Sequence, residues 1–206
     1  MKGKFITFEG SEGSGKSTQA KLLVQYLKSR GKKAIFLREP GGTVLSEKIR
    51  KILLDKTNKK ICPVSEMLLY MAARAQLILE VIKPALKKGY FVICDRFLDS
   101  TLAYQGWGLG VDLKLIQYLG DFLTRGIKPN LTIFLDVSIE KGLGACGRKL
   151  DRIEKRPIAY HKRVRQGYLE LAKKFPHRIE IIKPARKKSK TQAKIRQIIT
   201  PLLKGA

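Results

Sequence analysis

The chain has 206 residues, 44% of them hydrophobic, so its length and apolar content suit one α/β domain and exclude a collagen-like or disordered protein. Its 43 Lys and Arg against 17 Asp and Glu give a formal net charge of +26, so the surface must attract polyanions such as nucleic acid, nucleotides or acidic lipid. The apolar stretches are too short for a signal peptide or a membrane span, and the three cysteines suggest neither a disulfide framework nor a zinc site. We therefore expect a cytoplasmic protein that stays out of the membrane.

Five short apolar runs predict strands, and longer amphipathic segments between them predict helices. The runs are continuous and rich in β-branched and aromatic residues, which is typical of strands buried on both faces of a parallel sheet. Strands are expected at 5–8, 34–37, 91–94, 131–135 and 179–182, and helices at 16–29, 43–54, 65–86, 112–125, 139–146, 158–174 and 191–203. This alternation predicts a doubly wound α/β sandwich that occupies residues 1–206 as a single domain.

Three further segments differ from this pattern. Residues 106–110 hold the only Trp between glycines and are expected to be irregular. Residues 142–157 join several glycines to a charged run, which favours a mobile basic lid. The last 26 residues contain eight Lys or Arg and no Asp or Glu, and they form either a solvated cationic helix face or a contact for nucleic acid.

Residues 10–17 have the spacing of a phosphate-binding P-loop, between a predicted strand and a predicted helix. Glycines let successive backbone N–H groups turn toward phosphate oxygens, and the following helix adds its positive N-terminal end. Lys16 is expected to reach the transferring phosphate and the Ser17 hydroxyl to ligate Mg²⁺. The loop therefore predicts ATP binding by Gly10, Ser11, Glu12, Gly13, Ser14, Gly15, Lys16, Ser17 and Thr18.

Asp95 and Arg96 follow directly after another buried strand. A carboxylate there can orient a metal ion, and a guanidinium can grip phosphate oxygens in a bidentate manner. The alternative is an ordinary ion pair at the end of a strand. With a P-loop in the same chain, the pair favours Asp95 as a second Mg²⁺ ligand and Arg96 as a catalytic cation.

Five motifs together resemble those of the bacterial thymidylate kinases, which are P-loop nucleoside monophosphate kinases. They match in order and spacing, and they read Phe8-Glu9-Gly10-Ser11-Glu12-Gly13, Arg38-Glu39-Pro40-Gly41-Gly42-Thr43, Asp95-Arg96-Phe97 with Ala103-Tyr104-Gln105-Gly106, Asp151-Arg152-Ile153-Glu154, and Arg163-Val164-Arg165 with Gly167-Tyr168-Leu169. The resemblance implies a three-layer P-loop NTPase fold with a five-stranded parallel sheet and a short lid. It also implies transfer of the γ-phosphoryl group of ATP to dTMP, with Mg²⁺, in a homodimer.

The resemblance also implies contacts to the phosphate and sugar of dTMP. Arg38 and Arg96 match the arginines that hold the dTMP phosphate. Glu12 matches an acidic residue that reaches the sugar 3′-hydroxyl, and Tyr104 matches the ring that crowds the 2′ position. An acceptor phosphate is already ionised near neutral pH, so a general base is not required.

Contacts to the thymine base are implied in the same way. Tyr70 matches the aromatic residue that stacks on the base, and Arg74 matches a donor to thymine O4. These two residues are four apart, so they share one helix face. Thr101 and Gln105 match base-reading positions.

The lid departs from the family pattern because it is short and carries few arginines before the Asp-Arg-Ile-Glu motif. We expect four catalytic residues, Lys16, Asp95, Arg96 and Arg148, of which Arg148 is the cation that stabilises the transition state. Arg152 is expected to contact ATP. On the long helix, Met67, Met71 and Ile78 form an apolar face that serves either the core or a dimer interface.

Two other functions compete with dTMP phosphorylation. The high charge and the acid-free C-terminal segment fit a P-loop ATPase that nucleic acid stimulates, whereas the kinase requires no nucleic acid. A kinase for another nucleotide is the second alternative. Tyr70, Arg74, Thr101 and Tyr104 argue against it because together they suit a deoxypyrimidine.

Overall fold

The computed structural model describes residues 3–145 and 150–204, and it contains one five-stranded parallel sheet in the order β2-β3-β1-β4-β5. The expected strands are confirmed to within two residues. Their bounds are Lys4–Glu9 for β1, Ala34–Arg38 for β2, Phe91–Asp95 for β3, Leu131–Leu135 for β4 and Ile179–Ile182 for β5. Strands β3 and β2 lie on one side of central β1, and β4 and β5 lie on the other, so the direction of strand order switches at β1. In such sheets ligands bind at this switch point, at the carboxyl ends of the strands.

Central strand β1 explains why the sheet must be covered on both faces. Ile6 and Phe8 point into one apolar cluster, whereas Phe5 points into another on the opposite face. All three are at most 1% exposed, so neither face of the strand meets water. Continuous apolar runs of this kind are characteristic of parallel strands.

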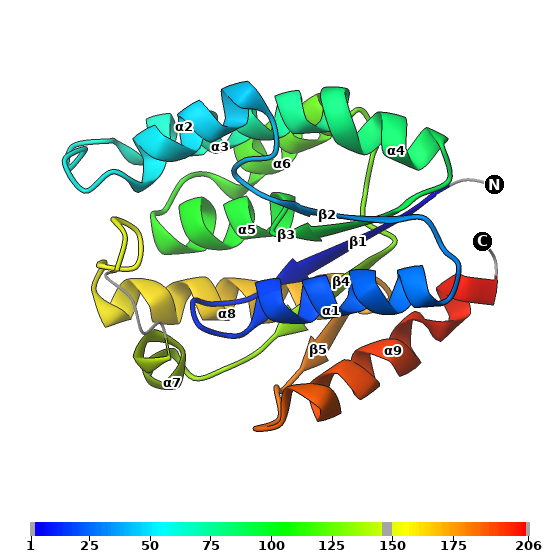
Figure 1. Ribbon diagram of the computed structural model, residues 1–206. Helices are drawn as coiled ribbons and strands as arrows, with labels where there is room; N and C mark the ends of the chain where they lie inside the picture. The colour runs from blue at the N-terminus through cyan, green and yellow to red at the C-terminus, as the bar shows by residue number, and fades with distance from the viewer. Residues whose placement is uncertain (1–2, 146–149, 205–206) are drawn as a thin grey trace.

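Helices lie on both sides of the sheet and complete a three-layer α/β fold, as predicted (Figure 1). One face is covered by α1 (Lys16–Ser29) and α9 (Lys188–Lys204). Two other clusters pack helices against the opposite face of the sheet. The helices on this side are α2 (Val44–Leu54), α3 (Pro63–Leu77), α4 (Lys83–Lys87), α6 (Leu113–Thr124) and α8 (Ile158–Lys174), with short α7 (Ile139–Gly144) beside the phosphate loop. A further cluster packs α2 against α3.

Side chains at the starts of several helices explain their boundaries. The Thr43 hydroxyl accepts a hydrogen bond from the Ser46 backbone N–H at 3.1 Å, and the Asp112 carboxylate accepts one from Leu115 at 2.7 Å. Such caps satisfy N–H groups that the helix itself leaves without partners. In the described residues, the structure contains no helix long and apolar enough to cross a membrane.

The prediction of an irregular segment at 106–110 is wrong for 106–108 and confirmed for 109–110, which follow the end of a helix. Helix α5 (Leu98–Thr101) continues directly into a π-helical segment, η2 (Leu102–Gly108). A Cβ atom at Gly108 would lie 2.5 Å from the Tyr160 ring, so glycine there allows η2 to pack closely on α8. Gly106 and Gly108 serve tertiary packing, whereas Gly110 has a positive φ of 79° and serves the turn after η2, a distinction that local sequence cannot make. A second π-helical turn, η1 (Ile78–Ile82), likewise divides the predicted 65–86 helix.

Candidate active site

A cavity of about 400 Å³ opens at the carboxyl edge of the sheet, next to the phosphate loop. It brings together most of the residues that the sequence singles out, although they lie up to 93 positions apart. Those that line it are Glu12, Gly13, Gly15, Lys16, Ser17, Thr18, Arg38, Tyr70, Asp95, Arg96, Thr101, Tyr104 and Gln105. Gly10, Ser11, Ser14, Arg74 and Arg152 lie outside the lining, and Arg148 lies outside the described residues.

The loop before α1 has the curled backbone expected of a phosphate cradle. Gly15 has φ 87°, in the left-handed region, and a Cβ atom at Gly10 would lie 2.5 Å from a backbone oxygen of β4. Lys16 bridges the loop from inside, because its Nζ donates to the Ser11 carbonyl at 2.7 Å. Burial and the neighbouring Arg96 charge lower the pKa of Lys16. The loop therefore holds a buried cation beside backbone donors, which is the chemistry that polyphosphate requires.

Two oxygen donors meet where the loop faces β3. The Ser17 hydroxyl donates to Asp95 Oδ2, and Asp95 Oδ1 is buried with no hydrogen-bond partner among residues 3–145 and 150–204. An unpartnered buried carboxylate oxygen beside a hydroxyl fits a Mg²⁺ ion, which takes one or two protein ligands and completes its shell with water and phosphate. The described residues contain no cluster of three His, Cys, Asp or Glu side chains that could bind a metal unaided.

Arg96 pairs with Glu12 rather than with its neighbour Asp95, so the alternative of a strand-end ion pair does not hold for the described residues. Arg96 Nη2 lies 2.7 Å from Glu12 Oε1, which also accepts the Tyr104 hydroxyl at 2.7 Å. Burial opposes ionisation of Glu12, but the charges of Arg96 and Lys16 outweigh it and lower the pKa of Glu12 to about 2. The guanidinium also stacks 4.6 Å from the Tyr104 ring centre. Glu12 and Tyr104 thus aim Arg96 at the cavity.

The backbone at Arg96 is strained, and this strained conformation directs the side chain toward the cavity. Its φ of 75° lies in the left-handed region, which a side chain disfavours. Such strain concentrates at functional sites, where surrounding contacts hold it in place.

Buried Glu9 supplies those contacts, a role that the sequence did not assign to it. One carboxylate oxygen accepts from the Phe97 N–H at 2.7 Å, and the other accepts from Ser100 at 2.6 Å and Tyr168 at 2.9 Å. Burial and the nearby Asp99 raise the pKa of Glu9 to about 7. Glu9 therefore ties the turn that follows β3 to α8.

The acceptor side of the cavity is lined by Tyr70, Thr101 and Gln105, while Arg74 lies behind it. Arg74 is 1% exposed and pairs with Glu39 at 2.7 Å. Its Nη1 donates to Thr101 Oγ1 at 3.0 Å. Arg74 therefore reaches the cavity through Thr101 in this structure. Burial raises the pKa of Glu39 despite the Arg74 charge.

Arg38 lies at the mouth of the cavity, with its side chain 41% exposed and paired with Glu47 at 3.0 Å. Arg50 lines the same wall and donates to the Pro40 carbonyl at 3.0 Å. Arg50 was not singled out from the sequence. Arg50 lies three residues after Glu47 on the same helix, so the two side chains share a helix face. This spacing is the signal that could have placed Arg50 near Arg38, the partner of Glu47.

Of the predicted lid, residues 142–144 belong to α7, and residues 151–156 form a turn whose Asp151 and Ile153 line the cavity. Asp151 Oδ1 accepts the backbone N–H groups of both Ile153 and Glu154 at 2.9 Å. Gly13 of the phosphate loop and Gly142 of α7 also meet backbone to backbone, a contact that a Cβ atom on either would block.

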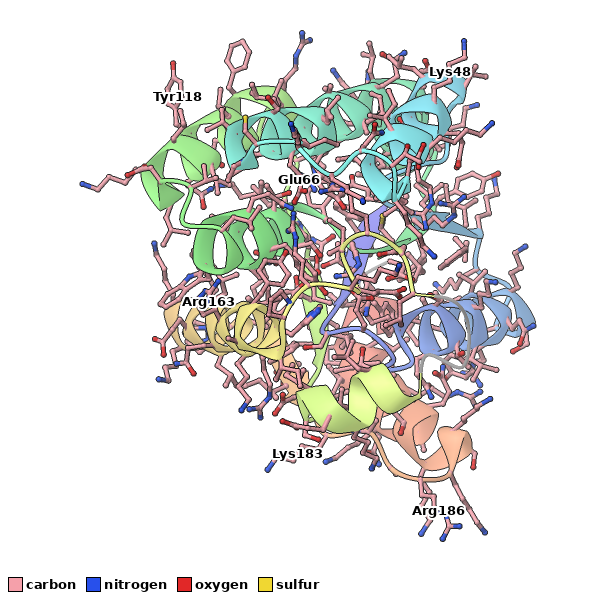
Figure 2. The ribbon with its side chains drawn as sticks, turned by 90° about the vertical axis from the view of Figure 1, so that its left-hand side faces the viewer. Lys48, Glu66, Tyr118, Arg163, Lys183 and Arg186 are labelled. Atoms are coloured by element: carbon pink, nitrogen blue, oxygen red, sulfur yellow. The ribbon has the colours of Figure 1, made fainter. Side chains whose placement is uncertain are left out.

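Glu66, which was not singled out from the sequence either, anchors this turn. It is fully buried on the side of α3 that faces the interior (Figure 2). Arg152 Nη2 lies 2.6 Å from Glu66 Oε2 and Arg156 Nη2 lies 2.7 Å from it, while the Gln105 amide donates to Glu66 Oε1 at 2.9 Å. Arg152, expected to contact ATP, is therefore engaged with α3 in this structure. One carboxylate links the lid segment to the acceptor side of the cavity.

A family model, curated relatives and a solved structure all indicate the same family for this chain. The family described as "Thymidylate kinase" matches residues 8–195. The chain is 47% identical over 201 residues to a thymidylate kinase of Geotalea uraniireducens, covering 94% of each chain. It is 45% identical over 207 residues to one of Caldanaerobacter subterraneus, covering 100% of this chain and 99% of the relative. The crystal structure of thymidylate kinase from Ehrlichia chaffeensis superposes with a TM-score of 0.80 at 34% identity, covering 97% of this chain and all of the other.

Proposed function

The chain belongs to the thymidylate kinase family, and from that premise we propose how its residues divide the transfer of the γ-phosphoryl group of ATP to dTMP. The reaction gives dTDP and ADP. This division of roles between donor and acceptor ends rests on one observation. The same cavity is lined by the phosphate loop and by the acceptor-side residues. Because the dTMP phosphate is already ionised, the protein needs to position two anions and neutralise their charge rather than remove a proton.

The donor end holds the triphosphate and its metal ion. Backbone N–H groups of residues 10–18 and the Lys16 ammonium bind the β- and γ-phosphates. Ser17 and Asp95 would hold Mg²⁺, whose bound charge offsets that of the phosphates. The lid predicted at 142–157 is expected to exclude water from this end while the phosphoryl group moves, and its described residues Asp151 and Ile153 already line the cavity.

The acceptor end holds dTMP. Arg38 and Arg96 bind its phosphate, and Glu12 accepts the sugar 3′-hydroxyl. Tyr70 stacks on the base, while Thr101 and Gln105 read its edge. Tyr104 is held against Arg96 and occupies the space of a ribose 2′-hydroxyl.

Two variants at opposite ends of the cavity test this division. Arg38→Met should raise the KM for dTMP about tenfold or more, because a charged hydrogen bond is worth about 1.5–3 kcal/mol, and leave the KM for Mg-ATP within about twofold. Ser17→Ala should raise the Mg²⁺ and ATP requirements instead. Steady-state kinetics with each substrate varied measures both, with Arg30→Met, an exposed arginine of the segment after α1, as the control. Equal losses for both substrates in either variant would contradict the assignment.

Glu66 should control closure of the lid. In Glu66→Gln the guanidinium groups of Arg152 and Arg156 lose their shared carboxylate, so backbone amides of 151–156 should exchange with solvent faster. We also expect kcat to fall about tenfold, because water enters the cavity when this segment opens. Hydrogen–deuterium exchange reports the segment directly, and Glu47→Gln, whose partner Arg38 lies outside the lid, is the matched control. Unchanged exchange at 151–156 would remove Glu66 from this role.

We further propose that the protein is a cytoplasmic homodimer. Met67, Met71 and Ile78, the candidates from the sequence, are at most 3% exposed and belong to the core of the protomer. Exposed apolar side chains lie instead on neighbouring helices α3 and α6, and they include Val64, Leu68, Tyr118 and Phe122. Contiguous exposed apolar surface of this kind marks association sites.

A charge on this surface should separate the protomers. Phe122 is 70% exposed, so Phe122→Glu costs little in the monomer, but it buries an unpaired carboxylate in the dimer. Sedimentation velocity should show a dimer for the wild type and a monomer for Phe122→Glu. Ile158→Glu, at a half-exposed position on α8, should stay dimeric. A dimeric Phe122→Glu protein would place the interface elsewhere.

A further inference from the structure

The face of the sheet covered by α1 and α9 carries positive charge that phosphoryl transfer does not use. Residues 13–38 contain seven Lys or Arg, of which Lys16 and Arg38 line the cavity and the other five do not, and residues 181–206 contain eight, yet neither segment has a single Asp or Glu. All 17 acidic residues lie elsewhere in the chain. The two acid-free segments are far apart in the sequence, and the fold places them together.

Contacts between α1 and α9 make their outer faces one surface. The Gln19 amide donates to the Lys188 carbonyl at 3.1 Å near the start of both helices. Seven residues further along α1, the Tyr26 ring lies 4.4 Å from the guanidinium carbon of Arg196. The helices therefore run side by side in the same direction, as Figure 1 shows.

Four lysines on this surface are exposed and form no ion pair with the described carboxylates. Lys21 and Lys28 of α1, and Lys190 and Lys194 of α9, are all exposed. None of these four forms an ion pair with any described carboxylate. Arg186, just before α9, projects outward at the edge of the molecule in Figure 2. We call this surface, defined by α1, α9 and the residues that flank them, the α1–α9 face.

The chemistry of the α1–α9 face distinguishes among polyanions. A helix that binds a lipid surface needs exposed apolar residues, and a site for single strands needs aromatic rings on which bases stack. Among the described residues, no large hydrophobic side chain of α1 or α9 is exposed, and the one aromatic ring, Tyr26, is covered by Arg196. Lysines alone suit a phosphate backbone, where contacts position a protein without reading sequence.

We propose that the α1–α9 face docks the enzyme onto the phosphate backbone of duplex nucleic acid, independently of base sequence. The docking goes beyond phosphoryl transfer. The cavity opens at the carboxyl edge of the sheet, whereas these lysines cover one of its faces, so the bound enzyme keeps its substrate access. Duplex therefore does not stimulate ATP hydrolysis.

Fluorescence anisotropy with a labelled DNA duplex of mixed sequence, about 30 base pairs long, tests the proposal over about 50 to 200 mM salt. The test variant carries Lys21→Gln, Lys28→Gln, Lys190→Gln and Lys194→Gln. The control carries Lys48→Gln, Lys51→Gln, Lys87→Gln and Lys88→Gln, four exposed lysines of α2 and the α4 region with the same change in net charge. Each lysine that no longer neutralises a phosphate should reduce the slope of log affinity against log salt by about 0.9.

The test variant should lose at least about tenfold in duplex affinity at 100 mM salt and up to about 3.6 in slope, while the control loses less than about threefold in affinity. Turnover with dTMP should be unchanged in both variants, which shows that they are folded. Four results would overturn the proposal: no duplex binding by the wild type, equal losses in test and control, tighter binding to a single strand of the same length, or equally tight binding to phosphatidylserine vesicles. If the fourfold variant does not fold, the Lys190→Gln, Lys194→Gln pair gives the same comparison against Lys87→Gln, Lys88→Gln.

Discussion

Replacing Lys16 by Met should lower kcat about a thousandfold, with little effect on folding. Its ammonium is the buried cation inside the phosphate loop, held by the Ser11 carbonyl at 2.7 Å. Removing one preorganised charge from a phosphoryl-transfer site costs about 3–4 kcal/mol of transition-state stabilisation, which corresponds to roughly 10²–10³ in rate, and the P-loop Lys also binds the ground-state phosphates.

Stability should not fall with activity in this variant. Burial and the Arg96 charge lower the pKa of Lys16, so keeping the ammonium charged costs the empty fold free energy rather than stabilising it. Met matches the length of the Lys stem and brings no charge. Single-turnover kinetics and urea unfolding of the same preparation measure the two effects. Lys21→Met, an exposed lysine of the same helix, is the control. A Lys16→Met enzyme within tenfold of the wild type would show that the cation is not used.

Arg74→Ala should destabilise the fold by about 3–5 kcal/mol, the largest loss that we expect from a single change. Arg74 is 1% exposed, and within the described part of the chain Glu39 has no ion-pair partner other than Arg74, at 2.7 Å. The second Glu39 oxygen is already buried without a hydrogen bond. Truncating the guanidinium would leave a buried, unpaired carboxylate.

Urea unfolding measures this loss, and the Arg38–Glu47 pair in the same neighbourhood provides the comparison. Both of its side chains are more than 40% exposed, so Arg38→Met should cost less than about 1 kcal/mol. Removing both buried charges, as in Arg74→Met with Glu39→Leu, should recover much of the stability. An Arg74→Ala protein as stable as Arg38→Met would contradict the role of the buried pair.

The same contacts refine the role of Arg74 in binding dTMP. Because Arg74 donates to Thr101 and does not line the cavity, we expect it to act as a positioning residue. The milder Arg74→Lys variant, provided it folds, should raise the KM for dTMP and leave the KM for ATP unchanged. Equal rises would assign Arg74 a purely structural part.

The strands and the phosphate loop were predictable because their signals are local. A strand buried on both faces of a parallel sheet is mostly apolar, as in 91–94, and a curled loop favours glycine where φ is positive, as at Gly15. Such requirements appear in a few consecutive residues. Helices were predictable except where packing overrides local preference, as in η2.

The partners of charged residues were not predictable, because the fold chooses them. Arg74 lies 35 positions from Glu39, and Glu66 gathers Arg152 and Arg156 from almost 90 positions away. A sequence with 43 basic residues offers many possible pairs, and only burial decides which of them form. Glu66 and Glu9 were therefore missed, although both organise the site.

The most direct test of dTMP phosphorylation by this cavity is ADP formation from Mg-ATP by the purified protein, with dTMP, dUMP, UMP, dCMP, AMP and DNA added separately. We expect turnover that depends strictly on dTMP, with dTDP recovered in equal amount, and no stimulation by DNA. Hydrolysis that ignores dTMP and rises with DNA would contradict the proposed function, because the cavity would then serve the phosphate loop alone.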